Sequence, residues 1–227
     1  MKGNQFAVIG LGRFGSNLAK QLIRQGFQVM GIDRRPAIVD EMSDELTHVV
    51  AADSTDEEHL KSIGIRNFDC VVVAIGDDIQ SSTLTAILLK ELGVKMVVAK
   101  ALSELHGRVL QKIGVDRIIF PERDMAIRVA NQLVSPNLLD YIELSKDYTI
   151  AEISVPLHIS GKTLGELNTR AEYGCSVVAI NTANGGVIIA PTASDVVQEQ
   201  DIMVLIGTNS QIERFEEEVI EEPPARR

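Results

Sequence analysis

Residues 8–17 read VIGLGRFGSN, in which three glycines stand at the spacing G-x-G-x-x-G directly after an apolar run. In that position Gly10 allows a tight turn, Gly12 leaves room for a pyrophosphate to approach, and Gly15 lets a helix pack closely on a strand. The exposed N–H groups and the positive end of the helix then attract phosphate, a contribution of roughly 0.3 to 2 kcal/mol from the helix dipole. The stretch therefore predicts a strand, a phosphate-binding turn and a helix, in that order.

The residues around this turn, up to about residue 120, alternate short apolar runs with longer segments of helical period. This pattern is typical of an α/β protein with a Rossmann-type doubly wound sheet, whose parallel strands are covered by helices on both faces. The expected strands are 6–9, 28–32, 48–51, 70–74, 96–99 and 117–120. The expected helices are 17–25, 37–44, 57–63, 81–92 and 104–112.

A second, small α+β C-terminal domain is indicated by a change of pattern after residue 120. A helix expected over 124–134 carries apolar residues four apart, Met125, Val129 and Leu133, and we expect this face to pack on another subunit or domain. Beyond the break at 135–137 the expected strands are 149–155, 176–181, 187–190 and 202–207, with helical patches at 163–172 and 211–218. The predicted organisation is a nucleotide-binding domain over 1–120, a crossover helix and linker over 121–144, the α+β domain over 145–218, and a disordered tail over 219–227.

Composition and charge restrict the class of partner. The 227 residues include 32 acidic and 22 basic side chains, and the net charge of -10 disfavours binding to nucleic acid or to anionic lipid. No stretch approaches the roughly 18 apolar residues of a membrane-spanning helix, so we expect a cytoplasmic protein without direct membrane insertion. Cys70 and Cys175 stand beside valine-rich runs and are expected to be reduced thiols in the core.

Asp33 ends the second expected strand and is the candidate contact for a ribose. An acidic residue there accepts hydrogen bonds from both ribose hydroxyls and repels a 2′-phosphate, which favours NAD, ADP or ATP. Arg34 and Arg35 follow directly and can instead neutralise a 2′-phosphate, so NADP stays an alternative. Arg13, inside the glycine-rich turn, adds a positive charge that would benefit a third phosphate more than a nicotinamide ribose; a solvated surface arginine is the alternative.

Polar residues after two further strands leave two interpretations open. Asp53 begins the sequence DSTD, where it either lines an adenine pocket or caps the next helix; capping is the expected role of residues 54–56. Glu122 and Asp124 follow the last strand of the sheet, where they either place carboxylates near a phosphate-bound cation or cap a helix N-terminus.

The sequence contains no evident group for hydride transfer. A dehydrogenase needs a proton donor near the nicotinamide, usually His, Tyr or Lys. His48, His59, His106 and His158 are each expected to be structural or exposed, with His106 on a polar helix face, and no Cys or His cluster has metal-ligand spacing. A nucleotide domain without catalytic residues favours a sensor, and not an enzyme, in which the nucleotide shifts a conformational equilibrium.

Two other classes of protein provide alternatives to this interpretation. The first is a small NAD(H)-dependent oxidoreductase or redox sensor. The second, a Rossmann-type transcription regulator, would require a basic winged-helix segment, and the sequence has none.

Several segments together resemble a known family. They are 6–15 (FAVIGLGRFG), 67–76 (NFDCVVVAIG), 80–85 (QSSTLT), 90–93 (KELG), 118–125 (IIFPERDM), 170–174 (RAEYG) and 199–201 (EQD). Over nearly its whole length the chain is similar to the RCK subunits, with TrkA N- and C-terminal domains, that regulate Ktr/Trk-type potassium transporters, and it looks close to the Ktr branch. The resemblance implies dimers that assemble into an octameric ring at the inner face of the membrane, bound to an integral-membrane potassium transporter subunit. It also implies that ATP activates the transporter and that ADP inactivates it.

The resemblance also implies a set of site residues. The nucleotide would be held by Gly10, Gly12, Arg13, Phe14, Gly15, Asp33, Asp53, Ser54, Ile75, Gly76, Lys100 and Glu122. Glu122 would additionally bind an activating cation, Mg²⁺ or another, at the nucleotide. Cyclic di-AMP would bind to the C-terminal domain at Arg170, Asn181 and Pro191, although the sequence NTANG after residue 180 departs from the basic stretch common in the family.

Overall fold

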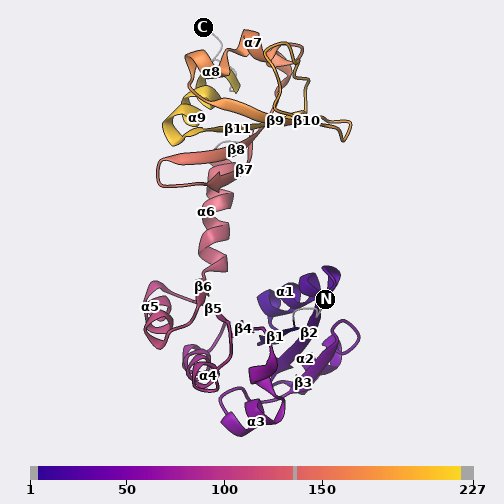
Figure 1. Cartoon of the computed structure of the whole chain (residues 1–227), viewed down its shortest axis with the longest axis vertical. Helices are drawn as coiled ribbons and strands as arrows, with labels where there is room; N and C mark the ends of the chain where they lie inside the picture. The colour runs from indigo at the N-terminus through magenta and orange to yellow at the C-terminus, as the bar shows by residue number, and fades with distance from the viewer. Residues whose placement is uncertain (1–4, 135–136, 221–227) are drawn as a thin grey trace. The chain divides into compact units, whose positions relative to one another are not determined.

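The chain forms two compact units, Met1–Glu122 and Arg123–Arg227. The computed structural model describes residues 5–134 and 137–220 (Figure 1). Residues 135–136 of the predicted break at 135–137 and residues 221–227 of the predicted tail lie outside the described residues. None of the described helices combines the length and the apolar character needed to cross a bilayer.

The first unit is built on six parallel strands in the order β3-β2-β1-β4-β5-β6. Their bounds are Gln5–Ile9 (β1), Gln28–Asp33 (β2), His48–Ala51 (β3), Cys70–Val73 (β4), Val97–Lys100 (β5) and Arg117–Ile119 (β6). The sequence predicted all six, with small differences at the ends. The predicted α/β, doubly wound class is therefore the observed one.

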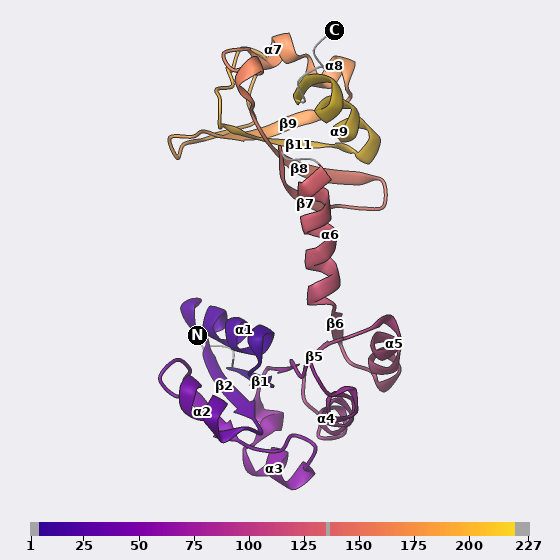
Figure 2. The ribbon, with the colours of Figure 1, turned by 180° about the vertical axis from the view of Figure 1, so that it is seen from behind.

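Helices cover both faces of this sheet because alternate strand residues point to opposite sides. On β4, Val71 and Val73 pack into a core with residues of α3, α4 and α5, whereas Cys70 and Val72 pack into a second core with residues of α1 and α2. The ribbon views show α1 and α2 on one side of the sheet and α4 and α5 on the other (Figures 1 and 2). Strands buried on both faces explain why the apolar runs are continuous. The helices are Arg13–Arg24 (α1), Pro36–Met42 (α2), Glu57–Ser62 (α3), Ile79–Glu91 (α4) and Glu104–Ile113 (α5), with a short 3₁₀ turn at Ile65–Asn67 (η1).

The ends of these helices follow from side-chain caps. Asp56, Asp78 and Ser103 each accept a backbone N–H in the first turn of α3, α4 and α5. In contrast, α1 has Gly12 at its N-cap, with no side-chain hydrogen bond and no acidic residue in its first turn. The helix starts at Arg13, earlier than the predicted residue 17, because the glycine-rich segment itself forms the first turn.

The second unit contains five strands in the order β10-β9-β11-β8-β7, all paired antiparallel. Helix Pro121–Val134 (α6) leads into it. The strands are Leu138–Glu143 (β7), Tyr148–Ser154 (β8), Ser176–Asn181 (β9), Val187–Ile189 (β10) and Ile202–Thr208 (β11). The helices are Leu157–Ile159 (η2), Leu164–Leu167 (α7), Thr169–Glu172 (α8), Asn209–Phe215 (α9) and the π-helical turn Glu216–Ile220 (η3). The small α+β domain predicted for this region is observed.

Three details of the second unit differ from the prediction. Residues 138–143, expected in a linker, form strand β7 on the edge of the sheet. The helix expected over 163–172 is divided, because Asn168 adopts a left-handed conformation (φ 48°) between α7 and α8. Val219 and Ile220, expected in a disordered tail, lie in η3, and Ile220 is buried.

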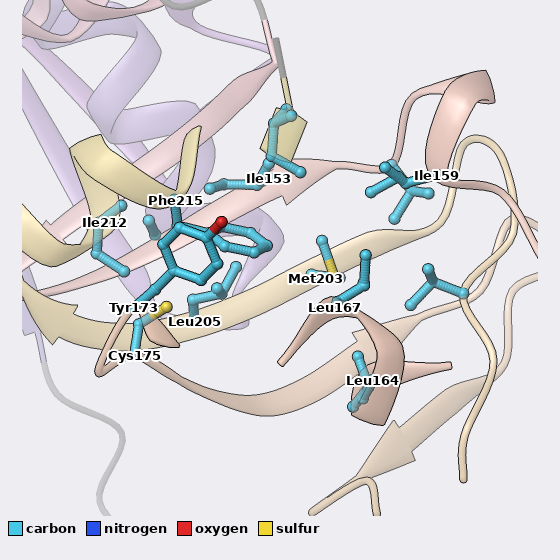
Figure 3. Packing of buried hydrophobic residues seen from close by; sticks show 14 of the residues in the cluster. Ile153, Ile159, Leu164, Leu167, Tyr173, Cys175, Met203, Leu205, Ile212 and Phe215 are labelled. Atoms are coloured by element: carbon cyan, nitrogen blue, oxygen red, sulfur yellow. The ribbon is translucent and has the colours of Figure 1, made fainter. Parts of the chain in front are cut away.

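The core of the second unit lies between its sheet and its helices. Tyr173 and Phe215 meet edge to face, with ring centroids 5.3 Å apart, and Ile153, Met203 and Leu205 pack around them (Figure 3). Cys175 belongs to this core, as predicted, and Cys70 is buried in the first unit.

Candidate nucleotide-binding site

A cavity of about 680 Å³ opens where the carboxyl ends of the strands of the first unit meet. Strands β2 and β4 lie on either side of β1, so the strand order reverses there, and ligands of doubly wound sheets bind at such a point. The lining residues are Ile9, Gly10, Gly12, Arg13, Phe14, Ile32, Asp33, Arg34, Arg35, Ala52, Asp53, Ser54, Ala74, Ile75, Gly76, Asp77, Asp78, Ser81, Lys100 and Glu122.

The three motif glycines have separate structural reasons. Gly10 turns with φ of 89°, and a Cβ there would lie 3.0 Å from the backbone nitrogen of Ile75. A Cβ on Gly15 would lie 1.9 Å from the carbonyl oxygen of Gly10, so this residue is required by helix packing. A Cβ on Gly12 would meet no described atom within 4 Å. The space beside Gly12 opens into the cavity, at the N-terminus of α1, where phosphate would be attracted.

Asp33 accepts four hydrogen bonds at the end of β2. Its Oδ2 accepts the backbone N–H of Leu11 at 2.9 Å and Nη2 of Arg35 at 3.0 Å. Its Oδ1 accepts the backbone N–H of Arg35 at 3.0 Å and the Nε of the same residue at 2.9 Å. Burial alone would raise the pKa of this carboxyl, but the hydrogen bonds from Arg35 and Leu11 outweigh it and hold the pKa below its ordinary value. Asp33 is thus a buried, ionised acceptor that faces the cavity.

Asp53 and Ser54 differ from each other in their surroundings. Asp53 lines the cavity and accepts both the N–H and the hydroxyl of Thr55, hydrogen bonds that lower its pKa. The helix cap is Asp56, as the expectation for residues 54–56 allowed. Ser54 is buried and shares a hydrogen bond with Thr85 at 2.8 Å.

A lysine and a glutamate meet in the lining of the same cavity. Lys100 ends β5 and is only 6% exposed, and its Nζ lies 5.8 Å from the ring centre of Phe14 and forms an ion pair with Glu122. The side chain of Glu122 is 70% exposed. The hydrogen bond from Lys100 lowers the pKa of Glu122, and the positive charge of Arg13 contributes in the same direction. Asp124 pairs with Arg123 and does not line this cavity.

The structure brings the predicted nucleotide residues together. All of them line the cavity except Gly15, which packs behind the turn. Sequence reasoning missed Asp77 and Asp78, in the loop after β4, and Ser81, in the first turn of α4, although the place of this segment at the reversal of strand order was a usable signal.

The other candidate residues lie elsewhere. Arg170 is on α8, Asn181 ends β9 and Pro191 follows β10, all in the second unit. His106, expected on a polar helix face, is instead buried in the first turn of α5, where its Nδ1 accepts the backbone N–H of Leu102. Burial lowers the pKa of His106.

Each of the two units matches a known family of domains. A doubly wound sheet with a glycine-rich turn and an acidic residue at the end of its second strand defines a Rossmann-type nucleotide-binding fold, here joined to a small antiparallel-sheet domain. Residues 6–121 match the TrkA-N domain and residues 149–219 match the TrkA-C domain. The chain therefore belongs to the TrkA family, as the sequence motifs indicated.

Two relatives from Bacillus subtilis show that the chain is similar to the Ktr branch of that family. The chain is 47% identical to Ktr system potassium uptake protein C of Bacillus subtilis, over 95% of this chain and 97% of the relative. It is 45% identical to Ktr system potassium uptake protein A of the same organism, over 96% of this chain and 98% of the relative.

Two solved structures are similar in fold. The GsuK channel bound to NAD matches 99% of this chain with a TM-score of 0.67 at 19% identity, and this chain spans 41% of that channel chain. GsuK bound to ADP matches 57% of this chain with a TM-score of 0.51 at 25% identity, and this chain spans 34% of it.

Proposed function

We propose that this chain is the cytosolic, nucleotide-sensing regulatory subunit of a Ktr-type potassium uptake system and is not an enzyme. The observation that carries the proposal is the cavity in which the Gly12 turn, Asp33 and the Lys100–Glu122 pair face one space. The two Bacillus subtilis relatives, similar over nearly their full length, supply the transport context.

ATP and ADP are the proposed ligands. The ionised Asp33 would accept the ribose hydroxyls and repel a 2′-phosphate, which disfavours NADP. Arg13 and Lys100 place positive charge at the end of the cavity where a polyphosphate would extend. A third phosphate would meet these charges in ATP and not in ADP, and a ligand shifts a conformational equilibrium only through such a difference in interaction. We propose that ATP favours the active state and ADP the inactive one.

Glu122 is the proposed ligand for a cation at the nucleotide. Among the described residues no group of three potential metal-binding side chains occurs. Mg²⁺, however, is commonly held by one or two carboxylates together with phosphate oxygens. An exposed, ionised Glu122 at the phosphate end of the cavity fits that donor set.

The proposed assembly is a ring of dimers attached to an integral-membrane transporter subunit. Helix α6 exposes Met125, Val129 and Leu133, which recur every four residues and form an apolar face that suits contact between subunits. We propose an octameric ring and, at Arg170, Asn181 and Pro191 of the second unit, a site for cyclic di-AMP as a second ligand; both rest on the family resemblance.

Potassium flux is the direct test of this proposal. The chain would be reconstituted with a Ktr-type membrane subunit in vesicles and assayed with ATP, with ADP and without nucleotide. ATP should give a higher flux than ADP, and Asp33→Ala should remove the difference. Asp44→Ala, which removes an exposed carboxylate outside the cavity, is the matched control and should keep it. Equal flux under all three conditions would overturn the proposal, and a response to NADH alone would favour a redox sensor.

A further inference from the structure

Arg35 occupies the carboxylate to which a ribose would bind. Three of the four hydrogen bonds to Asp33 come from this one residue, two of them from the guanidinium, which grips both carboxylate oxygens. A carboxylate offers about four acceptor positions in total. With the N–H of Leu11 as the fourth donor, Asp33 has its full complement.

The guanidinium and the ribose hydroxyls therefore require the same oxygen positions. The N–H groups of Leu11 and Arg35 that bind the Asp33 carboxylate belong to the backbone, so they stay in place when side chains rotate. The Nε and Nη2 of Arg35 are the two donors that side-chain rotation can remove, and two is the number of hydroxyls on an adenosine ribose. Exchange of one pair for the other would leave the buried carboxylate fully hydrogen-bonded.

We propose that Arg35 is an internal competitor of the nucleotide: ribose binding at Asp33 displaces the Arg35 guanidinium, and this competition sets the affinity for adenosine nucleotides. The inference rests on the proposed function, because it assumes that the ribose binds to Asp33. The competition makes Arg35 a residue that lowers the affinity for the nucleotide and so speeds the exchange of one nucleotide for another.

The surroundings of Arg35 allow the displacement. Its side chain is 53% exposed, whereas that of Asp33 is 4% exposed, so the arginine can rotate into solvent while the aspartate cannot. A second carboxylate, Asp77, also lines the cavity and already attracts Arg35 electrostatically. The displaced guanidinium thus keeps a favourable partner.

Arg34 is a matched control for Arg35. It lines the same cavity, carries the same charge and is similarly exposed, but its ion pair is with Asp78 at 3.9 Å and not with Asp33. Loss of either arginine removes one positive charge from the lining of the cavity. A difference between the two variants therefore reports on the hydrogen bonds to Asp33.

The test is a calorimetric titration of the full chain and its Arg35→Ala and Arg34→Ala variants with ADP and with 2′,3′-dideoxy-ADP. Compared with Arg34→Ala, Arg35→Ala should bind ADP about three- to fivefold more tightly, since an exposed ion pair has that order of effect. Binding of the dideoxy compound, which has no hydroxyls to replace the guanidinium, should be equal in the two variants. Arg35→Lys, which keeps the charge but cannot form the two-pronged contact, should lie between wild type and Arg35→Ala for ADP.

Equal or weaker ADP binding by Arg35→Ala relative to Arg34→Ala would overturn the competition. The same gain for ADP and for the dideoxy compound would also overturn it, because the effect would then be independent of the hydroxyls. Failure of the proposed function has a different signature, in which wild type binds no ADP or Asp33→Asn leaves ADP binding unchanged.

Discussion

Substitution of Gly12 by alanine should separate ligand binding from folding. A Cβ on this residue meets no described protein atom within 4 Å, and the backbone (φ -71°, ψ -171°) suits any residue. The loss of unfolding free energy should stay below about 1 kcal/mol, the cost of alanine at a helix N-cap. A methyl group would nevertheless occupy the space through which a pyrophosphate approaches α1. We expect ADP affinity to fall at least about tenfold, or 1.4 kcal/mol.

Gly15→Ala is the matched comparison for Gly12→Ala, because its expected effect is on stability. There the new Cβ would lie 1.9 Å from the carbonyl oxygen of Gly10, so the backbone must move. We expect a loss of about 1–3 kcal/mol in unfolding free energy, as is usual for overpacking. Urea denaturation and calorimetric titration of both variants are the assays. If Gly12→Ala bound ADP as tightly as wild type, the pyrophosphate would not lie at the glycine-rich turn.

Three further predictions concern ionisable groups. The hydrogen bonds to Asp33 hold its pKa below the ordinary 3.8. The contribution of Asp33 to stability is therefore present at neutral pH and is lost as the pH falls through that lowered value. Urea denaturation of wild type and Asp33→Asn as a function of pH should show the difference in their unfolding free energies shrinking only in acid. Burial raises the pKa of Cys175 to about 11, so a thiol reagent at pH 8 should label it after unfolding and not in the native protein; rapid native labelling would place this thiol outside the core. Glu122→Gln should abolish the Mg²⁺-dependent part of ATP affinity in calorimetry and leave ADP binding without Mg²⁺ within about twofold, whereas an unchanged Mg²⁺ dependence would remove Glu122 from the cation site.

The first unit could be predicted well from the sequence because its signals are local. Continuous valine runs define buried parallel strands, and the glycine spacing places the turn between β1 and α1. The candidate site residues converge because the carboxyl ends of parallel strands meet at one edge, which topology alone requires. The strand order also explains why Asp77 and Asp78 join them, since the loop after β4 lies at the point where that order reverses.

The remaining features depend on contacts that a linear pattern does not contain. The pairing of Arg35 with Asp33 is a choice of side-chain rotamer, and the sequence left Arg35 open to a role at a 2′-phosphate. Strand β7 is set by pairing with β8, and the division of the helix at Asn168 depends on a single left-handed residue. The burial of His106 likewise follows from packing of α5 on its own unit and not from the polarity of its neighbours in sequence.

The proposed regulation depends on an adenine nucleotide that binds in the first unit through Asp33. Equilibrium titration of the purified chain with ATP, ADP, NADH and NADPH, beside Asp33→Ala and the control Asp44→Ala, tests it most directly. We expect ATP and ADP to bind to wild type and to the control, the binding of both to be lost in Asp33→Ala, and NADPH to bind weakest. If Asp33→Ala still bound ATP and ADP, or if wild type clearly preferred NADH, Asp33 would not be the contact of an adenine nucleotide that switches transport.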